Sequence, residues 1–295
     1  MKNLVFRGAG TALVTPFTYD NKINYDMLEK IIEMQIKNKA DALIVCGTTG
    51  ESATLSSSEK RDLIKFVVKK ANKRIPIIAG TGSNNTFQAI ELTQYAENIG
   101  ADATLVVTPY YNKTTQRGLI RHFSEIASST SLPIILYNVP SRTGVNIEPQ
   151  TCYELSKINN IVGIKEASGN ISQIVYTKYL CKDNLHIYSG NDDQTIPILS
   201  TGGVGVISVL SNIYPMYVHD MCFNFFNGNI TKAMQMQINA VPLIKELFCE
   251  VNPIPIKYAM KIIGFDCGSP RLPLVDFSQE HQREMYQILS TNILK

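Results

Sequence analysis

PIILYNVPSRTG (133–144) and IVGIKEASGN (161–170) decide the fold, because each begins as a short apolar run and ends in polar residues. Runs that are apolar throughout, without alternation, are typical of parallel strands buried on both faces. Runs of the same kind recur along the chain. They predict strands at 11–14, 42–46, 76–79, 103–107, 133–137, 161–165, 185–189 and 204–207.

The segments between these runs have helical patterns, with apolar residues three and four positions apart, as in Leu28, Ile31 and Ile32. Eight strand–helix units in series predict a closed (β/α)8 TIM barrel of the α/β class. A doubly wound open sheet is the alternative, but no GxGxxG motif follows a strand. Beyond Phe226, helical segments at 230–248, 254–263 and 279–294 follow one another without strands. We therefore expect a catalytic barrel over 1–228 and a C-terminal helical domain over 229–295, packed on the barrel.

The composition excludes several classes of protein. Of the 295 residues, 44% are hydrophobic and 18% are charged, which suits a folded chain with a large core. The net charge is only +3, with Lys and Arg scattered, so neither nucleic acid nor an anionic membrane is predicted as a partner. The first apolar stretch is short and contains Arg7, and no run of about eighteen apolar residues occurs. A soluble cytoplasmic protein is expected.

Cysteine and histidine spacing predicts neither a disulfide framework nor a metal site. No CxxC pair and no HExxH motif occurs among the six cysteines and four histidines. The cysteines are therefore interpreted as free, mostly buried thiols of a reducing compartment. They stand at Cys46, Cys152, Cys181, Cys222, Cys249 and Cys267.

Polar residues follow most of the predicted strands. In a (β/α)8 barrel the catalytic residues lie at the carboxyl ends of the strands, so these residues are expected to meet at one rim. They supply hydroxyls, phenols, one lysine and one arginine. The segments are GTTGES (47–52), GTG (80–82), TPYYN (108–112), YNVPSRTG (137–144), KEAS (165–168) and SGND (189–192).

Lys165 is the sharpest single signal, because it ends the apolar run IVGI (161–164). Burial disfavours the ammonium form, and a neutral amine is the form that attacks a carbonyl carbon. Two structural alternatives remain open. Lys165 could extend to water at the strand end, or it could pair with Glu166.

Four further residues have a functional and a structural interpretation. Tyr137 ends the strand before that of Lys165, where its phenol could shuttle protons, although a core aromatic is the commoner case. Thr48 and Thr49 lie between glycines, where hydroxyls and N–H groups could hold a carboxylate, or could simply cap a turn. Arg142 has the planar fork that binds carboxylates, but it could also be a solvated surface charge.

These segments together resemble the dihydrodipicolinate synthase (4-hydroxy-tetrahydrodipicolinate synthase) family, in the superfamily of N-acetylneuraminate lyase. The resemblance covers almost the whole chain in family order. The matching segments are GTTGESATL (47–55), AGTGSN (79–84), VTPYYN (107–112), ILYNVPSRTG (135–144), GIKEASGN (163–170), YSGND (188–192), GVISV (205–209), NPIPIK (252–257) and RLPL (271–274).

The resemblance implies a barrel with a C-terminal helical domain, assembled as a homotetramer. It implies a lyase that condenses pyruvate with L-aspartate 4-semialdehyde through a Schiff base, towards diaminopimelate and lysine. No metal or organic cofactor is implied.

The resemblance also implies a role for each matching residue. Lys165 would be the Schiff-base nucleophile and Tyr137 the general acid and base. Thr48 would link Tyr137 to Tyr111 of a neighbouring subunit. The implied substrate-binding residues are Thr49 for the pyruvate carboxylate, Arg142 for the semialdehyde carboxylate, and Gly190 and Ile207 in the pocket wall.

Two other functions are compatible with the same lysine. One is another pyruvate-dependent aldolase, of the N-acetylneuraminate or 2-keto-3-deoxygluconate type. Against it, the arginine of Ser-Arg-Thr (141–143) is expected only where the second substrate is the semialdehyde. The other is a non-catalytic sensor of 2-oxo acids, which the intact set of catalytic residues disfavours.

Some relatives are expected to bind the inhibitor lysine at an interface site near Ser52, Ala53, Asn84 and Tyr110. In lysine-sensitive members, two histidines and a glutamate are expected close by. This chain has Ser57, Lys60 and Gln88 at those places. Loss of a carboxylate and gain of an ammonium disfavour a cationic ligand, so weak or absent lysine feedback is predicted.

Overall fold

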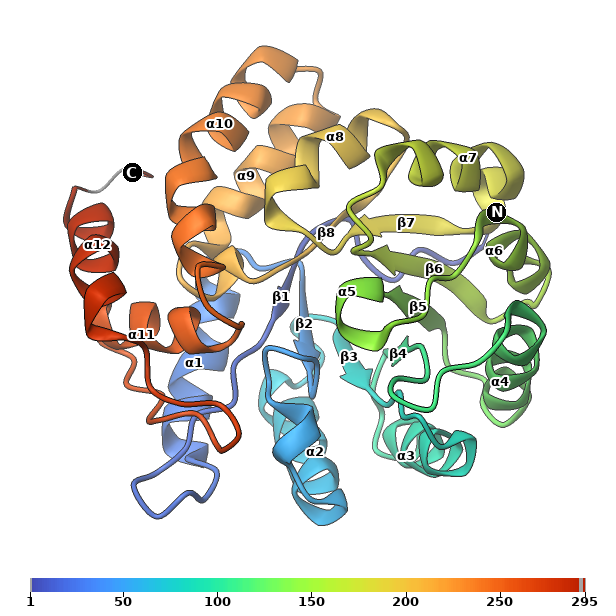
Figure 1. Cartoon of the computed structure of the whole chain (residues 1–295), viewed down its shortest axis with the longest axis horizontal. Coiled ribbons are helices and arrows are strands. Elements are labelled where there is room, and N and C mark those ends of the chain that lie inside the picture. The colour runs from blue at the N-terminus through green and yellow to red at the C-terminus, as the bar shows by residue number, and fades with distance from the viewer. Residues whose placement is uncertain (1, 292–293, 295) are drawn as a thin grey trace.

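A computed structural model of the chain describes residues 2–291 and 294. Its centre is a closed barrel in which eight parallel strands pair in sequence order, β1 returning to β8 (Figure 1). This confirms the predicted (β/α)8 class and excludes the open sheet. The strands are β1 (Gly8–Ala12), β2 (Ala42–Val45), β3 (Ile77–Gly80), β4 (Ala103–Val107), β5 (Ile134–Asn138), β6 (Ile161–Glu166), β7 (His186–Ser189) and β8 (Gly205–Ser208).

Helices surround the barrel, and the turns between them carry short 3-10 segments at Ser52–Thr54, Lys182–Asn184, Asp192–Gln194 and Leu210–Asn212. Helix α2 shows why a helix begins where it does. Ser56 Oγ accepts from the Glu59 N–H, and the Glu59 carboxylate accepts from the Ser56 N–H, which closes a capping box. The barrel helices are α1 (Tyr25–Lys37), α2 (Ser57–Ala71), α3 (Thr86–Asn98), α4 (Gln116–Ser128), α5 (Pro140–Thr143), α6 (Pro149–Ser156), α7 (Ile171–Cys181), α8 (Thr195–Ser200) and α9 (Pro215–Phe226).

Seven of the eight predicted strands agree with the structure to within one residue at each end, and the first was wrong. β1 begins at Gly8 rather than at residue 11. Its sequence GAGTA contains two glycines, so a search for apolar runs does not detect its start. The close approach of β1 to β8 requires these glycines. Gly8 pairs with Gly205, and a Cβ on Gly205 would lie 2.2 Å from the carbonyl oxygen of Gly8.

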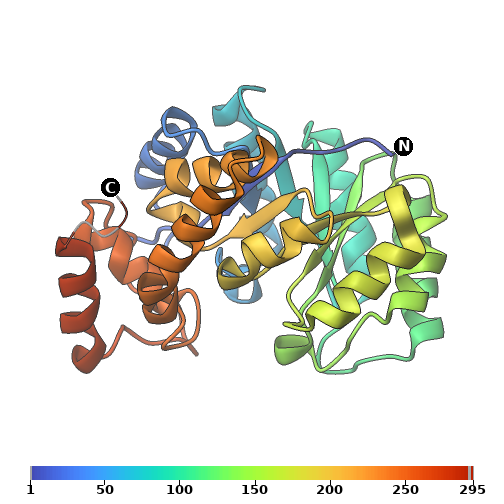
Figure 2. The same ribbon diagram turned by 90° about the horizontal axis from the view of Figure 1, so that it is seen from above.

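Three helices follow the barrel, namely α10 (Ile230–Leu247), α11 (Ile254–Ile262) and α12 (Gln279–Ser290). They gather at one side of the barrel (Figure 1, Figure 2). The end of the third predicted segment, residues 292–293, lies outside the described residues, as does residue 295. The apolar core is continuous between the two parts, because Leu63 of α2 and Ile256 of α11 belong to one buried cluster. We propose a boundary between residues 228 and 229, in the turn between α9 and α10.

No helix in the described part of the chain is both long enough and apolar enough to cross a membrane.

Candidate active site

Lys165 and Tyr137 face each other inside the barrel at the carboxyl ends of β6 and β5. The parallel register pairs the two residues directly, and both side chains are about 6% exposed. Lys165 Nζ lies 4.4 Å from the centroid of the Tyr137 ring. The structure therefore brings the two leading candidates together, as the sequence predicted.

A β-bulge aims Lys165 into the barrel. Ile134 pairs with Ile161 and Ile135 with Gly163, so Val162 is an extra residue in β6. Side chains alternate between the faces of a strand, and one extra residue reverses the alternation beyond it. Ile164 accordingly packs outside the barrel, against the helices, and Lys165 points inward.

Glu166 is not the partner of Lys165. It lies on the outer face of β6, where its carboxylate accepts hydrogen bonds from Asn138 Nδ2 at 3.1 Å and from the Ser168 N–H at 2.8 Å. Burial raises the pKa of Glu166. Among residues 2–291 and 294, no hydrogen bond or ion pair engages Lys165 Nζ. The amine is buried and, among the described residues, unpaired.

Asp192 is a buried carboxyl group that the sequence analysis quoted in YSGND (188–192) without a role. Its Oδ2 accepts from the Val209 and Leu210 N–H groups at 2.9 and 3.1 Å, while Oδ1 has no partner among the described residues. Burial raises the pKa of Asp192, and the Lys165 ammonium opposes this shift. Asp192 is thus a buried carboxyl group close enough to Lys165 to interact with it electrostatically.

The loop after β2 carries Thr48 and Thr49 and is fixed from outside the barrel. Thr49 is buried, and its Oγ1 accepts a hydrogen bond from Asn252 Nδ2 at 3.0 Å. Two non-glycine residues around the threonines, Cys46 and Glu51, have positive φ angles of 58° and 53°. A left-handed backbone at such residues is costly, so other contacts must hold it in place.

A buried ion pair holds Glu51. Its Oε1 lies 2.6 Å from Lys257 Nζ on α11, and the two side chains are 0% and 3% exposed. Its Oε2 accepts from the Arg271 N–H at 2.9 Å. Burial lowers the pKa of Lys257, and Glu51 opposes this shift. The C-terminal part therefore positions the loop that carries Thr48 and Thr49, called the threonine loop below. No local sequence pattern could reveal this long-range contact.

A cavity of about 290 Å³ opens beside Tyr137. Thr48 and Arg142 line it, and Arg142 Nη2 donates to the Asn252 carbonyl oxygen at 3.4 Å. Asn252 thus contacts both predicted carboxylate-binding side chains. Of the four residues expected near the site for the inhibitor lysine, Ser52, Ala53 and Tyr110 also line this cavity. Lys60 lines it too.

The remaining candidates lie apart from the cavity wall. Ile207 is buried with Tyr137 in the apolar cluster inside the barrel. Gly190 follows β7, where its N–H donates to the Glu166 carbonyl oxygen at 2.8 Å. Tyr111 is 92% exposed with a φ of 68°, and within the described part of this single chain no hydrogen bond joins it to Thr48 or Tyr137.

A closed parallel barrel with a buried lysine and tyrosine at its carboxyl end defines a (β/α)8-barrel enzyme. Comparison with known proteins gives the family. The model of the "Dihydrodipicolinate synthetase family" matches residues 5–292. The 4-hydroxy-tetrahydrodipicolinate synthase 1 of Clostridium acetobutylicum is 56% identical over 94% of both chains. That of Clostridium tetani is 52% identical over 98% of this chain and 99% of its own.

Solved structures agree. The crystal structure of dihydrodipicolinate synthase from Thermotoga maritima superposes with a TM-score of 0.96 at 42% identity, covering 99% of this chain and all of the other. The chain belongs to the dihydrodipicolinate synthetase family.

Proposed function

We propose that Lys165 forms a Schiff base with pyruvate and that the resulting enamine attacks L-aspartate 4-semialdehyde. The chain is a lyase of the 4-hydroxy-tetrahydrodipicolinate synthase type, as its family and relatives establish. The observation that supports the proposed mechanism is the buried, unpaired amine of Lys165 against the Tyr137 ring. Both curated relatives described above are synthases, which favours this substrate pair over that of the alternative aldolases.

The chemistry needs a nucleophile and a proton carrier side by side. The Lys165 amine adds to the carbonyl carbon of pyruvate, and loss of water leaves an imine. The protonated imine withdraws electrons, so the methyl group loses a proton and becomes an enamine carbon. That carbon bonds to the aldehyde carbon of the semialdehyde. The semialdehyde amine then displaces Lys165 from the imine carbon, which closes a six-membered ring and frees the enzyme.

Tyr137 is the proton carrier in this proposal, because its register places it beside Lys165. Thr48 extends the proton path from Tyr137, and Thr49 binds the pyruvate carboxylate. Arg142 binds the carboxylate of the semialdehyde, a role supported by its place in the wall of the cavity. Gly190 and Ile207 are proposed to contribute backbone groups to pyruvate binding near Lys165. None of these steps calls for a metal or an organic cofactor.

Tyr111 is proposed to complete the proton path of a neighbouring subunit in a homotetramer. Its high exposure and its left-handed backbone support this proposal, since a strained exposed aromatic suits a contact made on assembly. The enzyme is proposed to be cytoplasmic and to act in diaminopimelate and lysine biosynthesis. Weak or absent lysine feedback is proposed from Ser57, Lys60 and Gln88.

Borohydride trapping tests the mechanism. The protein is incubated with pyruvate and sodium borohydride, digested, and analysed by mass spectrometry. The peptide that contains Lys165 is expected to gain the mass of pyruvate less one oxygen atom, since water is lost and two hydrogens are added, and Lys165→Ala is expected to gain none. An unmodified Lys165 peptide in an active preparation would overturn the proposal.

Subunit mixing tests the role of Tyr111. Tyr111→Phe and Lys165→Ala are each expected to be nearly inactive alone. In a hybrid assembly, a site with an intact Lys165 can receive an intact Tyr111 from the partner, so activity is expected to return after unfolding and refolding the mixture. Absence of recovery in verified hybrids would place Tyr111 outside the neighbouring site.

A further inference from the structure

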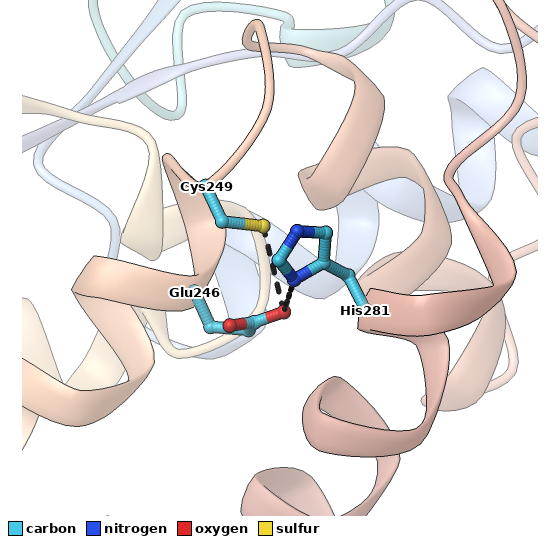
Figure 3. Close-up of side chains that lie close together, drawn as sticks. All are labelled: Glu246, Cys249 and His281. Atoms are coloured by element: carbon cyan, nitrogen blue, oxygen red, sulfur yellow. Dashed lines mark hydrogen bonds and ion pairs between the residues drawn. The ribbon is translucent and has the colours of Figure 1, made fainter.

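Glu246, Cys249 and His281 meet where the end of α10 packs against α12 (Figure 3). Glu246 Oε1 lies 3.5 Å from Cys249 Sγ and 3.5 Å from His281 Nδ1. The three donor atoms all lie within 4.8 Å of one another. Figure 3 shows the three side chains pointing toward one common point.

These spacings fit a tetrahedral metal ion. Zinc binds nitrogen and oxygen at about 2.0–2.1 Å and sulfur at about 2.3 Å, so neighbouring donors on a tetrahedron lie about 3.3–3.5 Å apart. Both contacts of Glu246 Oε1 have this separation. A thiolate and an imidazole select zinc or a similar transition metal and disfavour Mg²⁺ and Ca²⁺, which take oxygen donors.

His281 gives an independent indication. Its Nδ1 is buried and has no hydrogen-bond partner among the described residues, although it points into the cluster. The Glu246 carboxylate lies within ion-pair distance of this nitrogen at 3.5 Å without forming a hydrogen bond, and a bound cation would satisfy both groups. The Glu246 side chain is only 8% exposed, so its carboxylate also lies in a poorly hydrated position.

The local charge favours a dication. Glu246 supplies one donor of the cluster, and Glu250 directly follows Cys249 in the sequence. Glu284 adds a third carboxylate, with Oε2 3.9 Å from His281 Nδ1. These negative charges attract a metal ion, which displaces the thiol proton on binding.

We infer that Glu246, Cys249 and His281 form a zinc-type metal site that links α10 to α12, with water or Glu284 in the fourth position. Sequence spacing could not show it, because His281 lies on a separate helix. Cys249 is the one partly exposed cysteine of the six, so a metal ion can reach it from solvent. The site lies outside the proposed catalytic machinery and does not depend on the proposed reaction.

Cobalt titration tests this site. The full-length protein is treated with chelator and then titrated with Co²⁺, whose thiolate complexes give a sulfur-to-metal charge-transfer absorption. One Co²⁺ per chain is expected to bind with this absorption, and Zn²⁺ is expected to displace it. Zinc is also expected to protect the partly exposed Cys249 thiol from a disulfide reagent and to raise the melting temperature.

Variants separate a metal site from a hydrogen-bonded cluster. Cys249→Ser is expected to abolish the charge-transfer absorption, and His281→Gln to weaken binding more than about tenfold. Glu280→Gln, an exposed neighbour on α12, is the matched control and is expected to bind as the wild type does. Each variant is checked by circular dichroism. No thiolate absorption at millimolar Co²⁺, or an absorption retained in Cys249→Ser, would overturn the inference.

Discussion

The two halves of the active site are held in different ways. Lys165 and Tyr137 stand on neighbouring strands, so the backbone ladder of the barrel fixes their relative position. The threonine loop has no such ladder. It is held by Asn252 and by the ion pair between Glu51 and Lys257, from residues about two hundred positions further along the chain. The nucleophile therefore depends on the sheet, and the proposed carboxylate site depends on the C-terminal helices.

Removal of the nucleophile is expected to have the largest effect. Lys165→Ala should lower turnover by at least about 10³-fold, because it removes the amine that is proposed to form the imine. The unfolding transition should change little, since the backbone ladder remains. Steady-state kinetics and thermal unfolding measure the two effects, with the exposed Lys157→Ala as control. Near wild-type turnover in folded Lys165→Ala would refute the assignment.

Tyr137→Phe should lower kcat by about 10²–10⁴-fold, the usual range for loss of a general acid or base. The ring that packs against Lys165 is retained, so stability should be preserved. Tyr188→Phe is the matched control, because its hydroxyl donates to the Phe6 carbonyl oxygen at 2.8 Å and serves the fold. If Tyr137→Phe keeps its activity as Tyr188→Phe does, the Tyr137 hydroxyl is not the proton carrier.

Lys257→Met tests whether the buried ion pair with Glu51 holds the threonine loop in place. Removing one partner of a buried ion pair leaves an uncompensated charge, so the free energy of unfolding should fall by about 3–5 kcal/mol. A displaced threonine loop should also raise the KM for pyruvate by up to about 100-fold, with a smaller change in kcat. Denaturant unfolding and kinetics below the melting temperature measure these effects.

Two further variants show whether the effect of Lys257→Met comes from loss of the ion pair. Lys261→Met removes an exposed charge from the same helix and should change neither quantity. Glu51→Gln combined with Lys257→Met should recover part of the lost stability, because no charge is left unpaired. A Lys257→Met enzyme with unchanged KM would show that the loop keeps its position without the ion pair.

Asn252→Ala should have the smallest effect. It removes one neutral hydrogen bond to Thr49, worth about 1 kcal/mol, and should raise the KM for pyruvate about fivefold. Asn239→Ala, on the exposed face of α10, is the control. A change in kcat alone would argue that Asn252 acts on the chemical step instead of on binding.

Much of the barrel could be predicted from the sequence because the strands β2 to β8 are short apolar runs between polar segments. The first strand was predicted three residues too late because the glycines at the start of β1 carry no apolar signal, although the closure against β8 depends on them. The catalytic candidates were found at strand ends, where a parallel barrel must gather them. Asn252 and Lys257 were quoted within one motif but received no role, because nothing local links them to Thr49 or Glu51.

The sequence by itself determined the order of strands and helices, the family, and the lysine that ends an apolar run. These properties follow from local composition and spacing. Only the tertiary structure decided that the bulge at Val162 directs Lys165 inward, that Glu166 faces away from it, and that the C-terminal helices hold the threonine loop. The reason is physical, since orientation and long-range contacts depend on register and packing between segments far apart in the chain.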